Sequence, residues 1–211
     1  MGNQIGPTPL SSDDAPKRAD GRTMGKDLKL RKVTRIGTWN VRTLIQPGIL
    51  EFLIREMDRC HVNILGIAEL RWSGKGHFST DDHTIYYSGN EKGGSNGVAF
   101  FTSSFISKHV LGYNPVSDRI ISITIQALPT NLSIIQVYAP TSTASDDDLG
   151  YFYNQLQDTL DGIPKRDIIM ITGDFNAKVG EGVQHEMKPW QWVRMAWEVE
   201  MREVAHLLTS A

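Results

Sequence analysis

The sequence predicts an α/β protein built on a mixed sheet or on two sheets. Apolar runs of strand length recur along the chain, and the clearest of them spans residues 168–172. Two other segments, 49–60 and 146–160, space their apolar residues three or four apart, as amphipathic helices do. Short turn-like links join several of the strand-like runs, which indicates hairpins and therefore antiparallel pairs among the strands.

The expected elements can be justified in chain order. Ile49, Leu53 and Met57 share one face of the first helix. The second helix begins after three aspartates at residues 146–148, whose charges complement the dipole at a helix N-terminus. Residues 71–83 are expected to form a polar loop. Strands are expected at residues 35–41, 63–68, 84–88, 98–102, 119–126, 133–138 and 167–172, with a turn at 91–97 and a hairpin link at 128–131.

The 211 residues allow one domain with tails. Residues 1–34 are expected to be a disordered basic leader, because Gly, Pro, Ser, Asp and Lys dominate them and apolar side chains are few. The domain itself is expected at residues 35–180. Residues 181–211 differ in composition and hold three of the five tryptophans. Their apolar spacing predicts an amphipathic helix in this tail.

The composition narrows the class of protein. One cysteine, Cys60, allows no internal disulfide, so a reducing intracellular compartment, nuclear or cytoplasmic, is expected. Cys60 continues the apolar face of the first helix and is predicted to be buried. No apolar stretch approaches the ~20 residues of a membrane span. The net charge of −2 argues neither for nor against a nucleic-acid partner.

Polar side chains follow four of the predicted strands at the point where each apolar run stops. If these strands are neighbours, the polar groups converge at one edge of the sheet, where α/β proteins commonly bind ligands. The residues concerned are Asn40, Glu69 and Tyr138, and Asp174 together with Asn176.

These groups offer two carboxylates, two amide carbonyls and one phenol. Such hard oxygen ligands suit Mg²⁺, which keeps several waters and leaves room for a phosphate. Metal-assisted hydrolysis of a phosphodiester is the reaction that such a site favours. Zinc is not indicated, because Cys60 stands alone and the histidines lack the spacing of a zinc motif.

Each polar group also has a purely structural interpretation. Asp174 and Asn176 after Gly173 could form an Asx turn. Glu69 could be the surface salt-bridge partner of Arg71. Asn40 could cap a following turn, and Tyr138 could be a packed aromatic at a strand end. The occurrence of all the groups in one order favours the functional interpretation.

Four short motifs in this order resemble the endonuclease/exonuclease/phosphatase superfamily. They are TWNV at 38–41, IAEL at 67–70, QVYAPT at 136–141 and GDFNA at 173–177. Their wording is most similar to the endonuclease domains of retrotransposons of the bovine-type RTE (BovB) group. The resemblance implies a four-layer α/β sandwich of the deoxyribonuclease and apurinic endonuclease type, expected here to be incomplete at its C-terminus.

The resemblance also implies a role for each matching residue. Glu69 would be the principal ligand of Mg²⁺, which Mn²⁺ could replace, and Asn40 would lie beside the metal. Tyr138 and Asn176 would contact the scissile phosphate, and Asp174 would orient or deprotonate the attacking water. Arg42 departs from the family pattern, because several apurinic/apyrimidinic endonucleases carry an acidic group at this position. Arg42 is expected to bind substrate together with Tyr138 and Asn176.

The chain departs from the family pattern in its last part. It has neither an Arg-Ile-Asp-Tyr-like stretch nor a late Ser-Asp-His, and it contains no Asp after Asp174. The sequence therefore predicts a Mg²⁺-dependent endonuclease domain of retrotransposon descent with DNA as its partner. The alternative is a catalytically inactive remnant that binds nucleic acid or protein. Phosphoinositide phosphatases and sphingomyelinases have similar motifs, so a change of substrate is a third alternative. The residues within the four motifs of this chain fit those enzymes less well.

Overall fold

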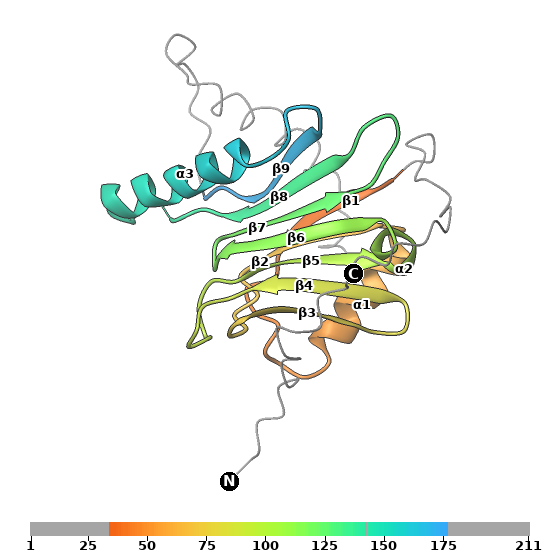
Figure 1. The fold of residues 1–211 in the computed structure, drawn as a ribbon. Helices are drawn as coiled ribbons and strands as arrows, with labels where there is room; N and C mark the ends of the chain where they lie inside the picture. The colour runs from red at the N-terminus through yellow and green to blue at the C-terminus, as the bar shows by residue number, and fades with distance from the viewer. Residues whose placement is uncertain (1–33, 142, 177–211) are drawn as a thin grey trace, which may run out of the picture.

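The computed structural model describes residues 34–141 and 143–176, and these form an α/β fold with two mixed sheets (Figure 1). The predicted basic leader, apart from its last residue, lies outside the described residues, as does the predicted helix in the tail. The expected α/β class is confirmed, and two sheets are present rather than one.

The first sheet has five strands in the order β1-β2-β5-β4-β3. β1 and β2 run parallel, and the other neighbours are antiparallel. Helix α1 connects the parallel pair, as a crossover between parallel strands requires. The elements are β1 (Ile36–Asn40), α1 (Ile49–Arg59), β2 (Ile64–Ala68), β3 (Lys75–Ser79), β4 (His83–Ser88) and β5 (Val98–Ser103).

The second sheet has four strands in the order β6-β7-β8-β9. Only β8 and β9 are parallel, and helix α3 connects them. The hydroxyl of Ser145 caps α3 by accepting a hydrogen bond from the Asp148 backbone N–H at 3.1 Å, and the three predicted aspartates lie in its first turn. The elements are α2 (Ser104–Ser107), β6 (Val110–Ser117), β7 (Ile120–Ile125), β8 (Leu132–Tyr138), α3 (Asp146–Asp161) and β9 (Ile168–Asp174).

Three apolar clusters hold four layers together. Leu53 and Met57 of α1 pack on the outer face of the first sheet with residues such as Phe101. A second cluster fills the space between the sheets. Phe152 and Leu156 of α3 pack on the outer face of the second sheet. Figure 1 shows the two helices on opposite outer sides, so the expected four-layer sandwich is confirmed.

Two sequence predictions about local structure are wrong. Residues 71–83 were expected to be a loop, yet β3 forms there, because its backbone pairs with β4 and only alternate side chains need shelter. Cys60 was expected to be buried, yet it is exposed. Helix α1 ends at Arg59, and the chain turns at Cys60 and His61, so the apolar periodicity no longer controls where Cys60 points. The elements α2 and β6 were not predicted.

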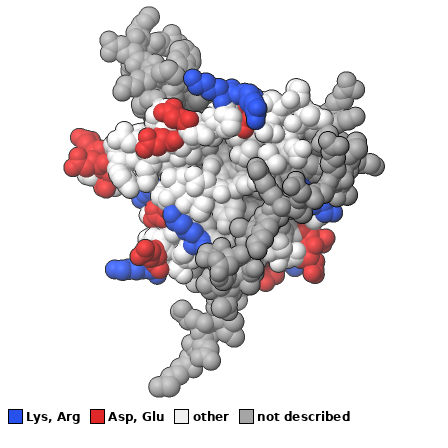
Figure 2. Space-filling view, viewed as in Figure 1, with Lys and Arg blue, Asp and Glu red and all other residues white. Residues whose placement is uncertain are grey.

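Charge is distributed without a dominant sign on the face shown in Figure 2. Lys and Arg side chains of the described residues stand there in separate groups, with acidic and uncharged surface between them. No helix among the described residues is long and apolar enough to cross a membrane.

Gly173 fixes how the last strand approaches its neighbour. Its φ is +141°, and a Cβ at this position would overlap the carbonyl oxygen of Val137 on β8. Val137 and Gly173 are directly opposite in the parallel pair, and Tyr138 and Asp174 follow as the next pair. Only glycine allows this approach.

Replacing Gly173 by alanine is expected to lower the free energy of unfolding by about 3 kcal/mol or more, because the methyl group would strain φ and collide with backbone. Gly150→Ala is the matched control. Gly150 lies within α3 with open space around it, so alanine there should be neutral or add up to about 1 kcal/mol. Urea unfolding measures both changes. Equal midpoints for the two variants would contradict the constraint at Gly173.

Candidate active site

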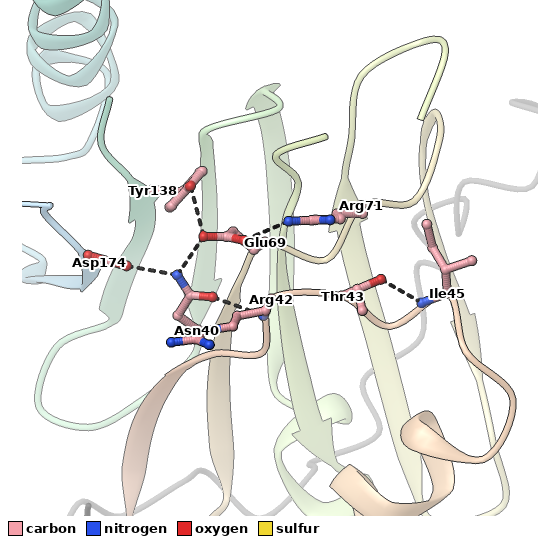
Figure 3. A network of polar contacts seen from close by, with 8 residues as sticks. All are labelled: Asn40, Arg42, Thr43, Ile45, Glu69, Arg71, Tyr138 and Asp174. Carbon is pink, nitrogen blue, oxygen red and sulfur yellow. Dashed lines mark hydrogen bonds and ion pairs between the residues drawn. The ribbon is translucent and has the colours of Figure 1, made fainter. Parts of the chain in front are cut away.

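The structure brings the predicted polar strand ends together (Figure 3). Asn40 and Tyr138 are the last residues of β1 and β8, Asp174 is the last residue of β9, and Glu69 directly follows β2. The expected meeting point at one sheet edge needs correction. The groups come from two sheets. β1 and β2 belong to the first sheet, β8 and β9 belong to the second, and β1 packs against β9 where the sheets face each other.

Asn40 links the carboxylates of the two sheets. Its Nδ2 donates to Glu69 Oε1 at 3.0 Å and to Asp174 Oδ2 at 2.8 Å. Its Oδ1 accepts the backbone N–H of Arg42 at 2.9 Å. The side chain therefore presents its amide hydrogens, and not its carbonyl oxygen, to the centre of the site.

Glu69 accepts hydrogen bonds on both carboxylate oxygens. Oε1 accepts the Tyr138 hydroxyl at 2.9 Å as well as the Asn40 amide, and Oε2 accepts Arg71 Nη2 at 3.2 Å. Burial raises the pKa of Glu69, but the hydrogen bonds from Asn40, Tyr138 and Arg71 together outweigh it. The net pKa lies below the ordinary value, so this carboxylate is ionised at neutral pH.

Tyr138 keeps its proton and points it at Glu69. Burial raises the pKa of Tyr138 first, and the hydrogen bond to Glu69 and the nearby negative charge add to this. Arg119 opposes the shift. Its guanidinium carbon lies 5.1 Å from the centre of the Tyr138 ring, and its Nη1 donates to the Tyr138 carbonyl oxygen at 3.1 Å. The phenol is therefore a fixed, neutral donor.

Asp174 and Asn176 form a turn at the end of β9. Asp174 Oδ1 accepts the backbone N–H of Asn176 at 2.9 Å, while Oδ2 faces Asn40. Asn176 Nδ2 donates to the carbonyl oxygen of Ala139 at 2.7 Å, which places this side chain beside the end of β8. Asn176 has a φ of +47°, a conformation that asparagine tolerates better than most residues.

The two arginines near the site differ in their contacts. Arg71 pairs with Glu69, and about two-fifths of its side chain is exposed. Arg42 is exposed, and its contact with the site is its backbone N–H on Asn40. Figure 3 shows Arg42 beside Asn40 at the edge of the network. Both arginines have positive φ, as does Glu69.

The structural interpretations of the four strand ends also prove correct. The Asx turn at Asp174, the Glu69–Arg71 ion pair and the turn capped by Asn40 are all present. Tyr138 is also packed in the apolar cluster between the sheets. The same local contacts that make each residue look ordinary hold its remaining polar atoms toward the common centre.

Sequence reasoning missed two kinds of residue around the site. Arg119 was predicted only as the first residue of the strand at 119–126, and it lies between β6 and β7 in the structure. It belongs to no motif, so its contact with Tyr138 has no signal in the sequence. Buried Gln136 and Thr172 and half-buried Thr38 form a polar row beneath the site. A signal for this row exists, because each of them stands two residues before a predicted site residue on the same strand.

Comparison with known proteins identifies the family of this chain. The pattern of the "Endonuclease/Exonuclease/phosphatase family" matches residues 37–194 of the chain. The chain belongs to the endonuclease/exonuclease/phosphatase family. The four motifs that carry the site fall inside the matched range.

Two curated relatives of the family domain are named craniofacial development protein 2, one from Tragulus javanicus and one from Bos taurus. Each is 46% identical over 145 residues, or 69% of this chain. The chain spans about a quarter of their length, because the match covers 25% and 24% of the two relatives.

The fold of the family domain is also found in the endonuclease domain of TRAS1, a telomere-specific non-LTR retrotransposon. The TM-score is 0.50 with 17% identity, and the match covers 70% of this chain and 61% of the other. At this identity the likeness shows the fold.

The side chains of the candidate site have the chemistry to hold a hard divalent cation. Among residues 34–141 and 143–176, no group of three or more His, Cys, Asp or Glu gathers as a metal site. Two carboxylates, Glu69 and Asp174, nevertheless approach the same amide nitrogen from opposite sheets. Mg²⁺ is commonly held by one or two carboxylates, with water and substrate oxygens as its other ligands. Glu69 and Asp174 could supply the carboxylate ligands of such a site.

Asn40→Asp tests whether the carboxylates depend on their shared donor. The substitution keeps the shape and the oxygen that accepts from Arg42, but it places a third carboxylate beside Glu69 and Asp174. In metal-free buffer at neutral pH, the free energy of unfolding should fall by about 2 kcal/mol. Asn114→Asp, on the exposed side of β6, should change it by less than about 0.5 kcal/mol. Equal stability of the two variants would show that the shared donor contributes nothing.

Proposed function

We propose that this chain is a Mg²⁺-dependent endonuclease domain of retrotransposon descent that hydrolyses DNA phosphodiester bonds with an activated water. One observation carries the proposal. The carboxylates of Glu69 and Asp174 meet at the amide of Asn40 with the phenol of Tyr138 alongside. This is an anionic, oxygen-rich centre with one fixed proton donor, as hydrolysis of a phosphodiester requires.

Glu69 is the residue that would hold Mg²⁺, or Mn²⁺ in its place, and its depressed pKa keeps it charged for that task. The bound ion supplies Lewis-acid stabilisation of the developing charge on phosphate. Asn40 positions Glu69 through its amide, which is the sense in which it assists the metal.

The other side chains act on the substrate and the water. Asp174 has one oxygen fixed by the turn and one toward the centre, so it can orient a water and accept its proton. Tyr138 can shift its hydroxyl hydrogen bond from Glu69 to a phosphate oxygen. Asn176 has a second amide hydrogen beyond the one given to Ala139, and it can donate that hydrogen to the phosphate.

DNA is proposed as the substrate on the wording of the motifs and on membership of the family. Arg42, exposed at the edge of the site, is the cation proposed to contact a neighbouring phosphate. An intracellular location, nuclear or cytoplasmic, is proposed from the single cysteine.

Plasmid nicking with Mg²⁺ tests the proposed activity. The parent chain is expected to nick supercoiled DNA, and Asp174→Ala and Glu69→Ala should each lower the rate about 100-fold or more, because each removes a group acting on the reacting atoms. Asp161→Ala is the matched control. This exposed carboxylate at the end of α3 lies outside the network, so the variant should nick at the parent rate.

A folded parent chain that does not nick would overturn the proposed activity. Binding of labelled DNA by that same chain would then favour the second candidate, a non-catalytic binding module. Nicking that survives both Asp174→Ala and Glu69→Ala would assign the activity to another site or to a contaminant.

Metal binding can be tested without turnover. Adding Mg²⁺ at about 100 times its Kd should stabilise the parent chain by about 2.7 kcal/mol, because the ion binds the folded state alone. Glu69→Gln should lose most of this gain, while Asp161→Asn should keep it. Isothermal titration and thermal unfolding with and without Mg²⁺ measure the difference. The same gain in Glu69→Gln as in the parent would exclude Glu69 as the metal ligand.

A further inference from the structure

A second polar row lies directly beneath the candidate active site. Thr38, Gln136 and Thr172 stand two residues before Asn40, Tyr138 and Asp174 on β1, β8 and β9. Because side chains alternate along a strand, residues two apart point to the same face. Each member of the lower row therefore shares a face with a member of the site.

The strand registers align the two rows. Thr38 pairs with Gly66 on β2, and Asn40 pairs with the next same-face residue of β2. Gln136 pairs with Thr172, and two positions on Tyr138 pairs with Asp174. The lower row is thus one step of the pleat away from the site in both sheets.

Gln136 ties the two sheets together within this row. Its Nε2 donates to Thr38 Oγ1 at 3.0 Å across the sandwich, and its Oε1 accepts from Thr172 Oγ1 at 2.7 Å within its own sheet. Thr38 Oγ1 also lies 3.3 Å from Gln136 Oε1. Both ends of the amide are therefore held.

The surroundings of Gln136 are otherwise apolar and closed. Gln136 is fully buried, and Thr172 is 3% exposed. The amide occupies the space that Gly66 leaves, since a Cβ on Gly66 would overlap Gln136 Oε1. A buried amide is costly unless it is hydrogen-bonded, so its position is tightly determined by Thr38 and Thr172.

We propose that Gln136 is a positioning residue that sets the separation of β1 from β8 and β9, and thereby holds Asn40, Tyr138 and Asp174 within contact distance. Two contacts of the site cross from one sheet to the other. Asn40 donates to Asp174, and Tyr138 donates to Glu69. Apolar packing between the sheets is non-directional and allows sliding. The hydrogen bond from Gln136 to Thr38 is directional, so it fixes both the distance between β8 and β1 and their position along one another.

The Tyr138 ring gives a direct measurement of this positioning that needs no turnover. The chain has six tyrosines, so ring-¹³C-labelled protein and the Tyr138→Phe variant assign the Tyr138 resonance. In Gln136→Met, which keeps the length of the side chain but removes the amide, we expect that resonance to move or to split into two states. Ser133→Ala is the matched control. Ser133 is a buried hydroxyl on β8 that bonds Asp167 at 3.1 Å and belongs to neither polar row.

The kinetic arm rests on the nuclease function proposed above, and the spectroscopic arm does not. In Gln136→Met, kcat for plasmid nicking should fall about 10-fold with KM unchanged, because the groups that act on the scissile phosphate are displaced, whereas the proposed contact of Arg42 with a neighbouring phosphate is not. Ser133→Ala should nick at the parent rate. A parent chain that does not nick ends the kinetic arm only, and the Tyr138 resonance still decides the positioning role.

One result would overturn the proposal. If Gln136→Met lowers the unfolding midpoint as Ser133→Ala does but leaves the Tyr138 resonance where it is in the parent, Gln136 contributes to stability alone. If Gln136→Met does not fold, Thr38→Val replaces it. That substitution keeps the shape of a half-buried side chain, removes the cross-sheet hydrogen bond, and is judged by the same resonance.

Discussion

The rest of the site depends on the approach of two carboxylates that belong to different sheets. Glu69 follows a strand of the first sheet and Asp174 ends a strand of the second, yet both accept a hydrogen bond from Asn40 Nδ2. Two like charges held this near one another repel, and the Asn40 amide shared by both carboxylates and the Arg71 guanidinium on Glu69 offset that repulsion. A cation bound between the two carboxylates would offset the repulsion further, and this is the physical basis of the metal site proposed above.

The backbone bears part of the cost of this approach. Glu69 and Asn176 leave their strands with left-handed φ values of +58° and +47°, and Gly173 takes a conformation closed to other residues. Left-handed residues other than glycine cost roughly 1–2 kcal/mol each. They persist where the surrounding packing over-determines them, and here Tyr138 at the end of β8 and Ala139 directly after it provide those contacts. Strain of this kind gathers at functional sites.

Much of the fold and of the site could be predicted because their signals are local. The apolar run at 168–172 and the polar residues after it needed no tertiary information. β3 could not be predicted, since it contains no apolar run and only its pairing with β4 makes it a strand. Arg119 was missed for the same reason, because its partner Tyr138 is 19 residues away on another strand. The assembly of the site from two sheets could not be predicted either, because it depends on how the sheets pack together.

The structural and functional interpretations of the strand ends are two aspects of one arrangement. An Asx turn uses Asp174 Oδ1 and leaves Oδ2 aimed at the centre. The turn at Asn40 uses its carbonyl oxygen and leaves the amide hydrogens for the carboxylates. Each residue has two polar atoms, and local geometry occupies one so that the other is fixed in direction. A side chain without its turn would rotate freely and lose entropy on meeting substrate. Local structure is therefore what fixes the direction of the polar atoms that the proposed hydrolysis would use.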